Sequence, residues 1–188
     1  RLRDRALGQI LDEAVAAHPD KEVIVYVDRD FRKTYREFAE GVDRMARGLM
    51  ALGVQKGEKV AIWATNIPHW VTLQFATAKI GAILLTVNTN YKSAELAYLL
   101  KQSECENLFV INGYRDSDYV QTVYELVPEL RTSQRGYMKS AGFPHLKRVF
   151  FLGHEKHRGM YTIPEVEAMA NMVTDADYEA RKARNHPD

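Results

Sequence analysis

The sequence predicts an α/β fold in which an open, mostly parallel sheet carries helices on both faces. Three short apolar runs lie within residues 53–111, at residues 60–64, 82–87 and 108–111. Each run is continuous rather than alternating, which is typical of strands covered on both faces. A helical pattern separates each run from the next, so the connections are crossovers, and crossovers join parallel strands.

The first of these helical patterns covers residues 68–80. Pro68 suits its first turn because proline has a preset φ and lacks an N–H that this turn would leave unpaired. The side chains are apolar nearly all round, which predicts a buried helix rather than an amphipathic one. Gly81 is expected at the C′ position, where a left-handed residue ends a helix at least cost. In the second pattern, Ser93 is expected to cap the helix.

Before this central unit, the sequence predicts a hairpin followed by a well-specified helix. Residues 22–27 and 31–34 resemble two strands joined by a tight turn. Thr34 and Glu37 have the spacing of a capping box, in which each side chain satisfies the other's backbone N–H. The helix that they begin is expected to end at Gly53.

After the central unit, the sequence predicts a helix capped by Asp116 or Ser117 and a fourth parallel strand at residues 147–152. Residues 129–146 and 153–160 are interpreted as irregular connections, because glycine, proline and polar residues interrupt any periodicity there. Two further helices are expected, at residues 164–169 and 175–184.

Composition narrows the possible functions. The 188 residues are 46% hydrophobic and 27% charged with a net charge of +1, as in ordinary soluble proteins. A nucleic-acid partner would favour a basic stripe, so none is expected. The single cysteine, Cys105, excludes an internal disulfide and favours a cytoplasmic location. No apolar run is long enough for a transmembrane segment, and the N-terminus lacks the shape of a signal peptide.

Many short segments match one known family in order and spacing. They are TYREF at residues 34–38, GV at 53–54, KG at 56–57, VA at 60–61, NIP at 66–68, AKIGA at 78–82, Asn88, Tyr91, EL at 95–96 and YLL at 98–100. Together they resemble the N-terminal part of the acyl-adenylate-forming (AMP-binding) superfamily, and within it the medium- and long-chain fatty-acid–CoA ligases. The resemblance covers most of residues 34–111 and continues more loosely to the end.

The resemblance implies a function for a longer parent enzyme. Such a ligase joins a fatty acid to ATP, forming an acyl-adenylate and pyrophosphate, and coenzyme A then displaces AMP. The implied cofactors are ATP, Mg²⁺ and coenzyme A, and the implied partners are the fatty acid and the remainder of the same core domain. Residues 1–188 would be the N-terminal part of that domain, ending before its phosphate-binding loop. The fragment alone is therefore expected to be inactive and to bind none of these cofactors.

No residue of this chain is predicted to be catalytic or to bind a metal ion. The sequence has no G-x-G-x-x-G and no G-x-x-x-x-G-K-[ST] motif. Residues 132–136, with Lys139 downstream, lack the glycines that let backbone N–H groups surround a phosphate, so they are not interpreted as the family's phosphate loop. His154 and His157 lie on a polar stretch without a third ligand and are expected at the surface. Cys105 is interpreted as an inert buried thiol.

One loop has a possible binding function. Residues 87–92 follow a parallel strand and precede a helix, at the edge where ligands of open α/β sheets collect. The resemblance implies that this loop lies near the path of coenzyme A, with Asn90 in contact and Tyr91 beside it. In the alternative interpretation, Asn88 and Asn90 form a turn and Tyr91 packs the loop down.

Two other functions remain open at this point. The chain could be a free-standing α/β binding or regulatory module, which a stop codon after Asp188 would favour. It could also belong to an adenylate-forming ligase with an aryl or amino acid substrate, because the resemblance implies that acyl-pocket residues come mostly from later segments.

Overall fold

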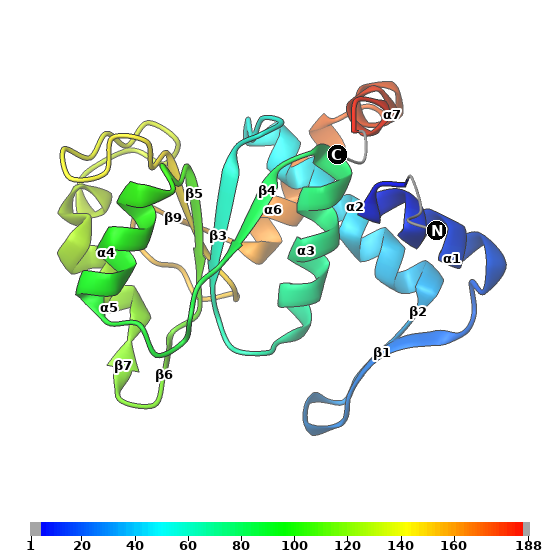
Figure 1. Ribbon diagram of the computed structural model, residues 1–188, viewed down its shortest axis with the longest axis horizontal. Coiled ribbons are helices and arrows are strands. Elements are labelled where there is room, and N and C mark those ends of the chain that lie inside the picture. Colours follow the sequence, from blue (N-terminus) through cyan, green and yellow to red (C-terminus); the bar gives the residue numbers. More distant parts are fainter. Residues whose placement is uncertain (1–4, 186–188) are drawn as a thin grey trace. The chain divides into compact units, whose positions relative to one another are not determined.

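The computed structural model describes residues 5–185, which form two compact units. Of the described residues, the first unit contains 5–56, 67–82 and 167–185, and the second contains 57–66 and 83–166. Helix α6 (Ile163–Met169) carries the chain from the second unit back into the first. Figure 1 shows the elements of both units.

The second unit is built on a five-stranded parallel sheet. Its strands have the order β4-β3-β5-β8-β9, and every neighbouring pair is parallel. They are β3 (Lys59–Trp63), β4 (Ile83–Thr86), β5 (Asn107–Val110), β8 (Arg148–Phe151) and β9 (Met160–Thr162). The predicted parallel arrangement of the three central runs and of the strand at residues 147–152 is confirmed. The fifth strand, β9, begins at Met160, the last residue of the stretch that was interpreted as an irregular connection.

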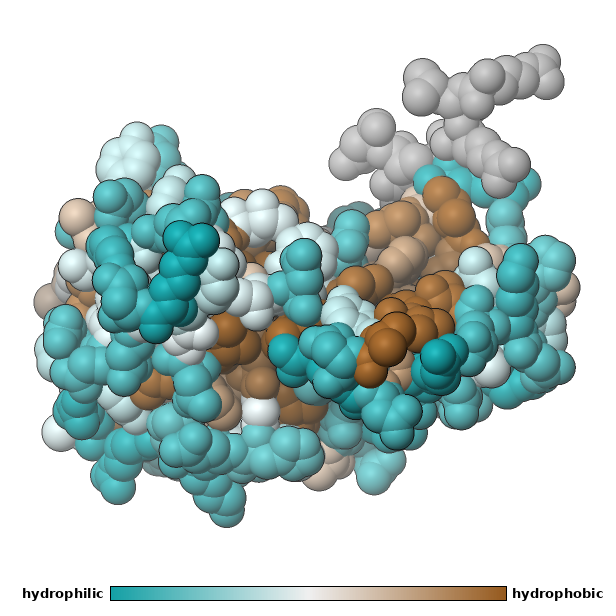
Figure 2. Space-filling model, turned by 90° about the horizontal axis from the view of Figure 1, so that it is seen from below, coloured by the Kyte–Doolittle hydropathy of each residue, from teal (hydrophilic) through white to brown (hydrophobic). Residues whose placement is uncertain are grey.

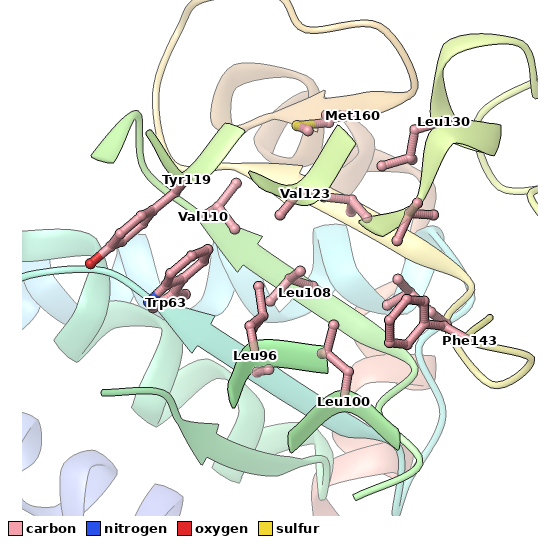
Figure 3. Close-up of a cluster of buried hydrophobic side chains, with 14 of the residues drawn as sticks. Trp63, Leu96, Leu100, Leu108, Val110, Tyr119, Val123, Leu130, Phe143 and Met160 are labelled. Atoms are coloured by element: carbon pink, nitrogen blue, oxygen red, sulfur yellow. The ribbon is translucent and has the colours of Figure 1, made fainter. Parts of the chain in front are cut away.

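One face of this sheet carries the core of the second unit. Helices α4 (Ser93–Gln102) and α5 (Tyr119–Leu126) supply apolar side chains to a cluster with alternate residues of the strands. In Figure 3, Leu96 and Leu100 of α4 and Val123 of α5 lie over Leu108 and Val110 of β5. On the opposite face, the rings of Phe109 and Phe150 are fully buried and stack with their centroids 4.2 Å apart.

Strand β4 differs from the prediction that each run is covered on both faces. Among the described strands it pairs with β3 alone, so it forms an edge of the sheet. Ile83 is 49% exposed, and Thr86 is also exposed. Its apolar pattern was therefore misleading, because burial depends on neighbouring strands as well as on composition. On the face that Figure 2 draws, hydrophobic residues reach the surface among hydrophilic ones.

The first unit consists of helices and the predicted hairpin. Strands β1 (Glu22–Tyr26) and β2 (Phe31–Thr34) pair antiparallel around the short 3₁₀-helix η1 (Val27–Arg29). The helical elements are α1 (Leu7–Ala17), α2 (Tyr35–Ala51), α3 (Pro68–Ile80), η3 (Ala170–Met172) and α7 (Asp175–Ala183). Every residue of α3 is buried or partly buried, which agrees with the prediction of a buried helix.

Both ends of α2 follow the local signals in the sequence. The Thr34 hydroxyl accepts the N–H of Glu37 at 3.3 Å, and the Glu37 carboxylate accepts the N–H of Thr34 at 2.9 Å. Gly53 has φ 84°, and the N–H of Val54 donates to the Leu49 carbonyl at 3.0 Å, which completes a Schellman motif. Gly81 likewise ends α3 with φ 73°.

Two predicted caps are wrong. Helix α4 is capped by Lys92, whose N–H donates to the Glu95 carboxylate at 3.1 Å, so Ser93 is the first helical residue. Helix α5 is capped by Asp118, which accepts the N–H of Gln121 at 2.8 Å, instead of by Asp116 or Ser117. A short antiparallel ribbon, β6 (Gly113–Tyr114) and β7 (Ser117–Asp118), holds residues 113–118 and moves the start of the helix.

The remaining connections of the second unit are irregular. The 3₁₀-helix η2 (Pro128–Arg131) follows α5, and residues 132–147 and 152–159 contain neither helix nor strand. Within residues 5–185, no helix is long and apolar enough to cross a membrane.

Candidate functional site

The carboxyl ends of the parallel strands bring several loops to one edge of the second unit. Strand β3 ends at Trp63, β4 at Thr86 and β5 at Val110. The loops that follow β4 and β5 are residues 87–92 and 111–118. In open α/β sheets, ligands bind outside the carboxyl ends of the strands, so this edge is the candidate site.

The loop at residues 87–92 is held by its own backbone. The N–H of Val87 donates to the Ile62 carbonyl at 3.1 Å, which extends the β3–β4 pairing by one residue. The Asn88 side chain then accepts the N–H of Asn90 at 2.9 Å, and the N–H of Tyr91 donates to the Asn88 carbonyl at 3.1 Å. This is an Asx turn, in which a side-chain oxygen fixes the backbone two residues further on.

Two stacked aromatic rings support the loop from beneath. The rings of Trp63 and Tyr119 lie 3.6 Å apart with an interplanar angle of 6°, and both side chains are fully buried. The indole N–H of Trp63 donates to the Asn88 carbonyl at 3.1 Å, and the Tyr119 hydroxyl donates to the Thr89 carbonyl at 2.5 Å. Figure 3 shows the two rings side by side, with the Tyr119 hydroxyl pointing out of the cluster. Burial raises the pKa of Tyr119, so its hydroxyl remains a donor at neutral pH.

The two residues singled out from the sequence occupy different positions in this loop. Asn90 is exposed, and its side chain makes no hydrogen bond within the described residues. Tyr91 is partly buried and packs against the core cluster of the second unit. The turn formed by Asn88 and the packing of Tyr91 fit the alternative interpretation, in which these residues shape the loop and do not bind a ligand. Contact between Asn90 and coenzyme A stays a prediction.

A cluster of charged side chains lies beside this loop. The Lys92 ammonium donates to the Ser117 hydroxyl at 2.6 Å and to the Asp116 carboxylate at 3.2 Å. The hydrogen bond from Lys92 to the Asp116 carboxylate lowers the pKa of Asp116. Arg115 is exposed in the same ribbon with φ 54°, and its guanidinium lies 5.1 Å from the centre of the Tyr114 ring. The proximity of Lys92 and Arg115 could not be predicted from the sequence, because only the strand order brings their loops together.

Other candidate groups show no reactive geometry. The Cys105 thiol is buried and donates to the Asn107 carbonyl at 3.1 Å, and burial raises its pKa to about 11. His154 is exposed, whereas His157 is only partly exposed and packs edge-on against the Phe151 ring. Within residues 5–185, no group of three or more His, Cys, Asp or Glu side chains is arranged to hold a metal ion.

Comparison with known proteins identifies relatives across nearly the whole chain. The family model of the AMP-binding enzymes matches residues 11–168. A Bacillus subtilis (strain 168) protein named "Putative acyl-CoA synthetase YngI" is 45% identical over 175 residues, which cover 93% of this chain and 32% of that protein. The human medium-chain acyl-CoA ligase ACSF2, mitochondrial, is 34% identical over 148 residues, which cover 79% of this chain and 24% of the human protein.

A solved structure has the same fold. It is described as a "putative long-chain-fatty-acid CoA ligase" from Rhodopseudomonas palustris CGA009, and it superimposes with a TM-score of 0.70 at 25% identity. The match covers 88% of this chain and 37% of that chain. The chain thus spans about a third or less of the length of the curated relatives described above.

Proposed function

Because this chain belongs to the family of AMP-binding enzymes, we propose that it is the N-terminal part of the core domain of a fatty acyl-CoA synthetase. The observation that carries the proposal is the 45% identity to a protein named as an acyl-CoA synthetase, which extends over 93% of this chain. A free-standing binding module is less well supported, since the matched relatives are named as an acyl-CoA synthetase and an acyl-CoA ligase.

The proposed reaction of the parent enzyme has two steps. A carboxylate repels nucleophiles, so its oxygen first attacks the α-phosphorus of ATP, and pyrophosphate leaves. The resulting acyl-adenylate is a good electrophile. The thiolate of coenzyme A then attacks the acyl carbon, and AMP leaves with the bonding electron pair. Both steps concentrate negative charge, which such enzymes stabilise with preorganised donors and cations.

The described residues supply a scaffold and one candidate wall of the coenzyme A path. The Asx turn and the Trp63–Tyr119 stack fix the loop at residues 87–92, which leaves the Asn90 amide exposed. Lys92 is paired with Asp116, so Arg115 supplies the exposed positive charge that suits the phosphates of coenzyme A. No phosphate-loop motif is present in the sequence, so ATP and Mg²⁺ would be held by other parts of the parent enzyme. The single cysteine favours the cytoplasm as its location.

The activity is tested on the parent polypeptide. We expect the full reading frame to release pyrophosphate from ATP in the presence of a fatty acid and to form acyl-CoA when coenzyme A is added. The 188-residue chain, assayed in parallel, should do neither. Turnover with aryl or amino acids but not with fatty acids would transfer the assignment to the other adenylate-forming ligases. Absence of pyrophosphate release with any carboxylic acid would refute the proposal.

The loop assignment is tested separately. Asn90→Ala in the parent enzyme should raise the KM for coenzyme A several-fold and leave adenylate formation unchanged, because only the second step uses coenzyme A. Gln102→Ala is the matched control, since Gln102 is also exposed and ends helix α4 away from the loop. An unchanged KM for coenzyme A in Asn90→Ala would remove this residue from the path.

A further inference from the structure

The second unit contains a cavity that the proposed ligase reaction does not use. Its volume is about 600 Å³, which is within the range of small-molecule sites. It lies between residues 132–135 and residues 156–160, with Glu165 at its border. Residues 156–160 follow strand β8, whereas the loop at residues 87–92 follows strand β4. Strands β3 and β5 lie between β4 and β8 in the sheet, so β4 and β8 are about 14 Å apart.

The walls of the cavity are fixed by close contacts. Gly159 has φ 79°, and a Cβ atom there would lie 2.3 Å from the Leu130 carbonyl oxygen, so only glycine permits this approach. The guanidinium Nε of Arg158 donates to the Arg131 carbonyl at 3.0 Å. The Tyr124 hydroxyl donates to the Arg158 carbonyl at 2.9 Å. The two segments are therefore held together before any ligand binds, which reduces the entropy lost on binding.

The charges around the cavity do not cancel. Three cationic residues line it, Arg135, Lys156 and Arg158, against one carboxylate, Glu165. Glu165 is already satisfied: one oxygen accepts from Arg135 at 2.7 Å, and the other accepts the Thr162 N–H at 2.8 Å. Burial acts to raise the pKa of Glu165, but these donors outweigh it, so the pKa is lowered and the group is ionised. Within residues 5–185, neither Lys156 nor Arg158 has a carboxylate partner.

Other polar residues also line the cavity, among them His157. The Nε2 atom of His157 is buried without a hydrogen-bond partner among the described residues. Its nearest carboxylate oxygen, on Glu155, is 3.9 Å away, which is too far for a hydrogen bond. Thr132 and Ser133 bring hydroxyl groups to the same cavity.

From this arrangement, we propose that the cavity binds the phosphate group of a small phosphomonoester, with Lys156 and Arg158 as its cationic ligands. A phosphomonoester carries about −1.5 to −2 charges at neutral pH, which matches the two uncompensated cations. Its oxygens accept hydrogen bonds from the guanidinium and hydroxyl donors around it. The segment at residues 132–136 is thus part of a phosphate site formed by side chains from two loops, without the backbone cradle of a glycine-rich loop.

The experiment titrates the 188-residue chain with glucose 6-phosphate, inorganic phosphate and glucose, using amide chemical shifts and calorimetry. We expect both phosphates, but not glucose, to shift the amides of residues 132–135 and 156–160. Lys156→Glu should weaken phosphate binding by about tenfold or more, because it reverses one of two cationic ligands. Lys139→Glu makes the same charge change on an exposed lysine that does not line the cavity, and it should change the affinity less than about twofold.

Three outcomes would overturn the proposal. They are the absence of phosphate binding at millimolar concentration, equal weakening by Lys156→Glu and Lys139→Glu, and binding to phosphatidic acid vesicles without binding to either free phosphate. Equal weakening would indicate general charge attraction, and vesicle binding alone would indicate a membrane surface. The site does not depend on the ligase proposal, so its failure would leave the family assignment unchanged.

Discussion

The Tyr178 hydroxyl donates a hydrogen bond of 2.7 Å to Oδ1 of Asp43, which ties helix α7 to helix α2 across 135 positions of sequence. The same carboxylate oxygen lies 2.7 Å from the ammonium of Lys79, whose side chain is only 1% exposed. Asp12 is a second partner of Lys79, at 2.6 Å. A buried ammonium needs such partners, because an unpaired charge in the interior is very costly. This network therefore joins four helices of the first unit around one lysine.

Removing the Tyr178 hydroxyl tests how much its hydrogen bond to Asp43 contributes to the stability of the first unit. Tyr178→Phe should lower the free energy of unfolding by about 1.5–3 kcal/mol, the usual range for a hydrogen bond to a charged group. Urea denaturation measures the change. Tyr98→Phe is the matched control, because Tyr98 is 70% exposed. Equal stability of Tyr178→Phe and the unmodified chain would mean that the hydrogen bond contributes nothing net.

A second buried charge lies at the amino ends of the strands in the second unit. The Glu58 carboxylate accepts from Lys147 at 2.6 Å, Asn107 at 3.1 Å and Arg148 at 3.3 Å. Burial acts to raise the pKa of Glu58 above 4.5, but these three donors outweigh it and the pKa is lowered. The ionised form therefore stabilises the fold above pH 4.5, and this stability is lost as the pH falls through the lower folded-state pKa.

Glu58→Gln should remove this contribution. We expect it to lower the free energy of unfolding at pH 7 by about 2–4 kcal/mol, because it leaves two cations without their common partner. Its stability should also depend less on pH below 4.5 than that of the unmodified chain. Urea denaturation at several pH values measures both effects. Glu104→Gln is a control at a carboxylate whose side chain is 60% exposed. Parallel pH profiles for Glu58→Gln and the unmodified chain would contradict the linkage.

Contacts between residues close in the sequence could be predicted, whereas contacts between distant residues could not. The capping box of Thr34 and Glu37 was predictable, because both partners lie within one helical turn. The parallel strands followed from continuous apolar runs separated by helices. The pairing of Lys79 with Asp12 and Asp43 was not predictable, since its partners lie 67 and 36 positions away.

The same limit applies to the caps and to the candidate site. Asp116 and Ser117 are good capping residues, but both instead contact Lys92, which follows a different strand. Asn90 and Tyr91 were singled out by resemblance and position, whereas Lys92 and Arg115 required the strand order. The cavity near residues 132–135 could not be predicted from the sequence either, because its proposed cationic ligands Lys156 and Arg158 come from a loop that follows β8.

The buried thiol gives a chemical test of the second unit. With a pKa of about 11, about 0.1% of Cys105 is thiolate at pH 8. We therefore expect iodoacetamide to modify the native chain very slowly and the urea-unfolded chain rapidly, as followed by mass spectrometry. In Gln102→Cys combined with Cys105→Ser, the cysteine occupies an exposed site and should react at the rate of an ordinary thiol. Fast modification of native Cys105 at pH 8 would refute the assignment of an inert thiol.

The last prediction concerns the exposed edge strand β4, which pairs only with β3 among the described strands. An unpaired edge with an apolar residue can pair with another chain, and Ile83 on this edge is 49% exposed. We expect the 188-residue chain to self-associate with increasing concentration and Ile83→Lys to reduce that association, since a lysine on an edge strand opposes pairing. The free energy of unfolding should change by no more than about 0.5 kcal/mol.

Sedimentation velocity over a range of concentrations measures this association. Val27→Lys is the matched control, because Val27 is an 82% exposed apolar residue in η1, outside the strands, and gains the same charge. If β4 is the contact, Ile83→Lys should shift the chain toward the monomer while Val27→Lys leaves the distribution unchanged. Equal effects of the two variants would show that net charge, and not the strand edge, controls association.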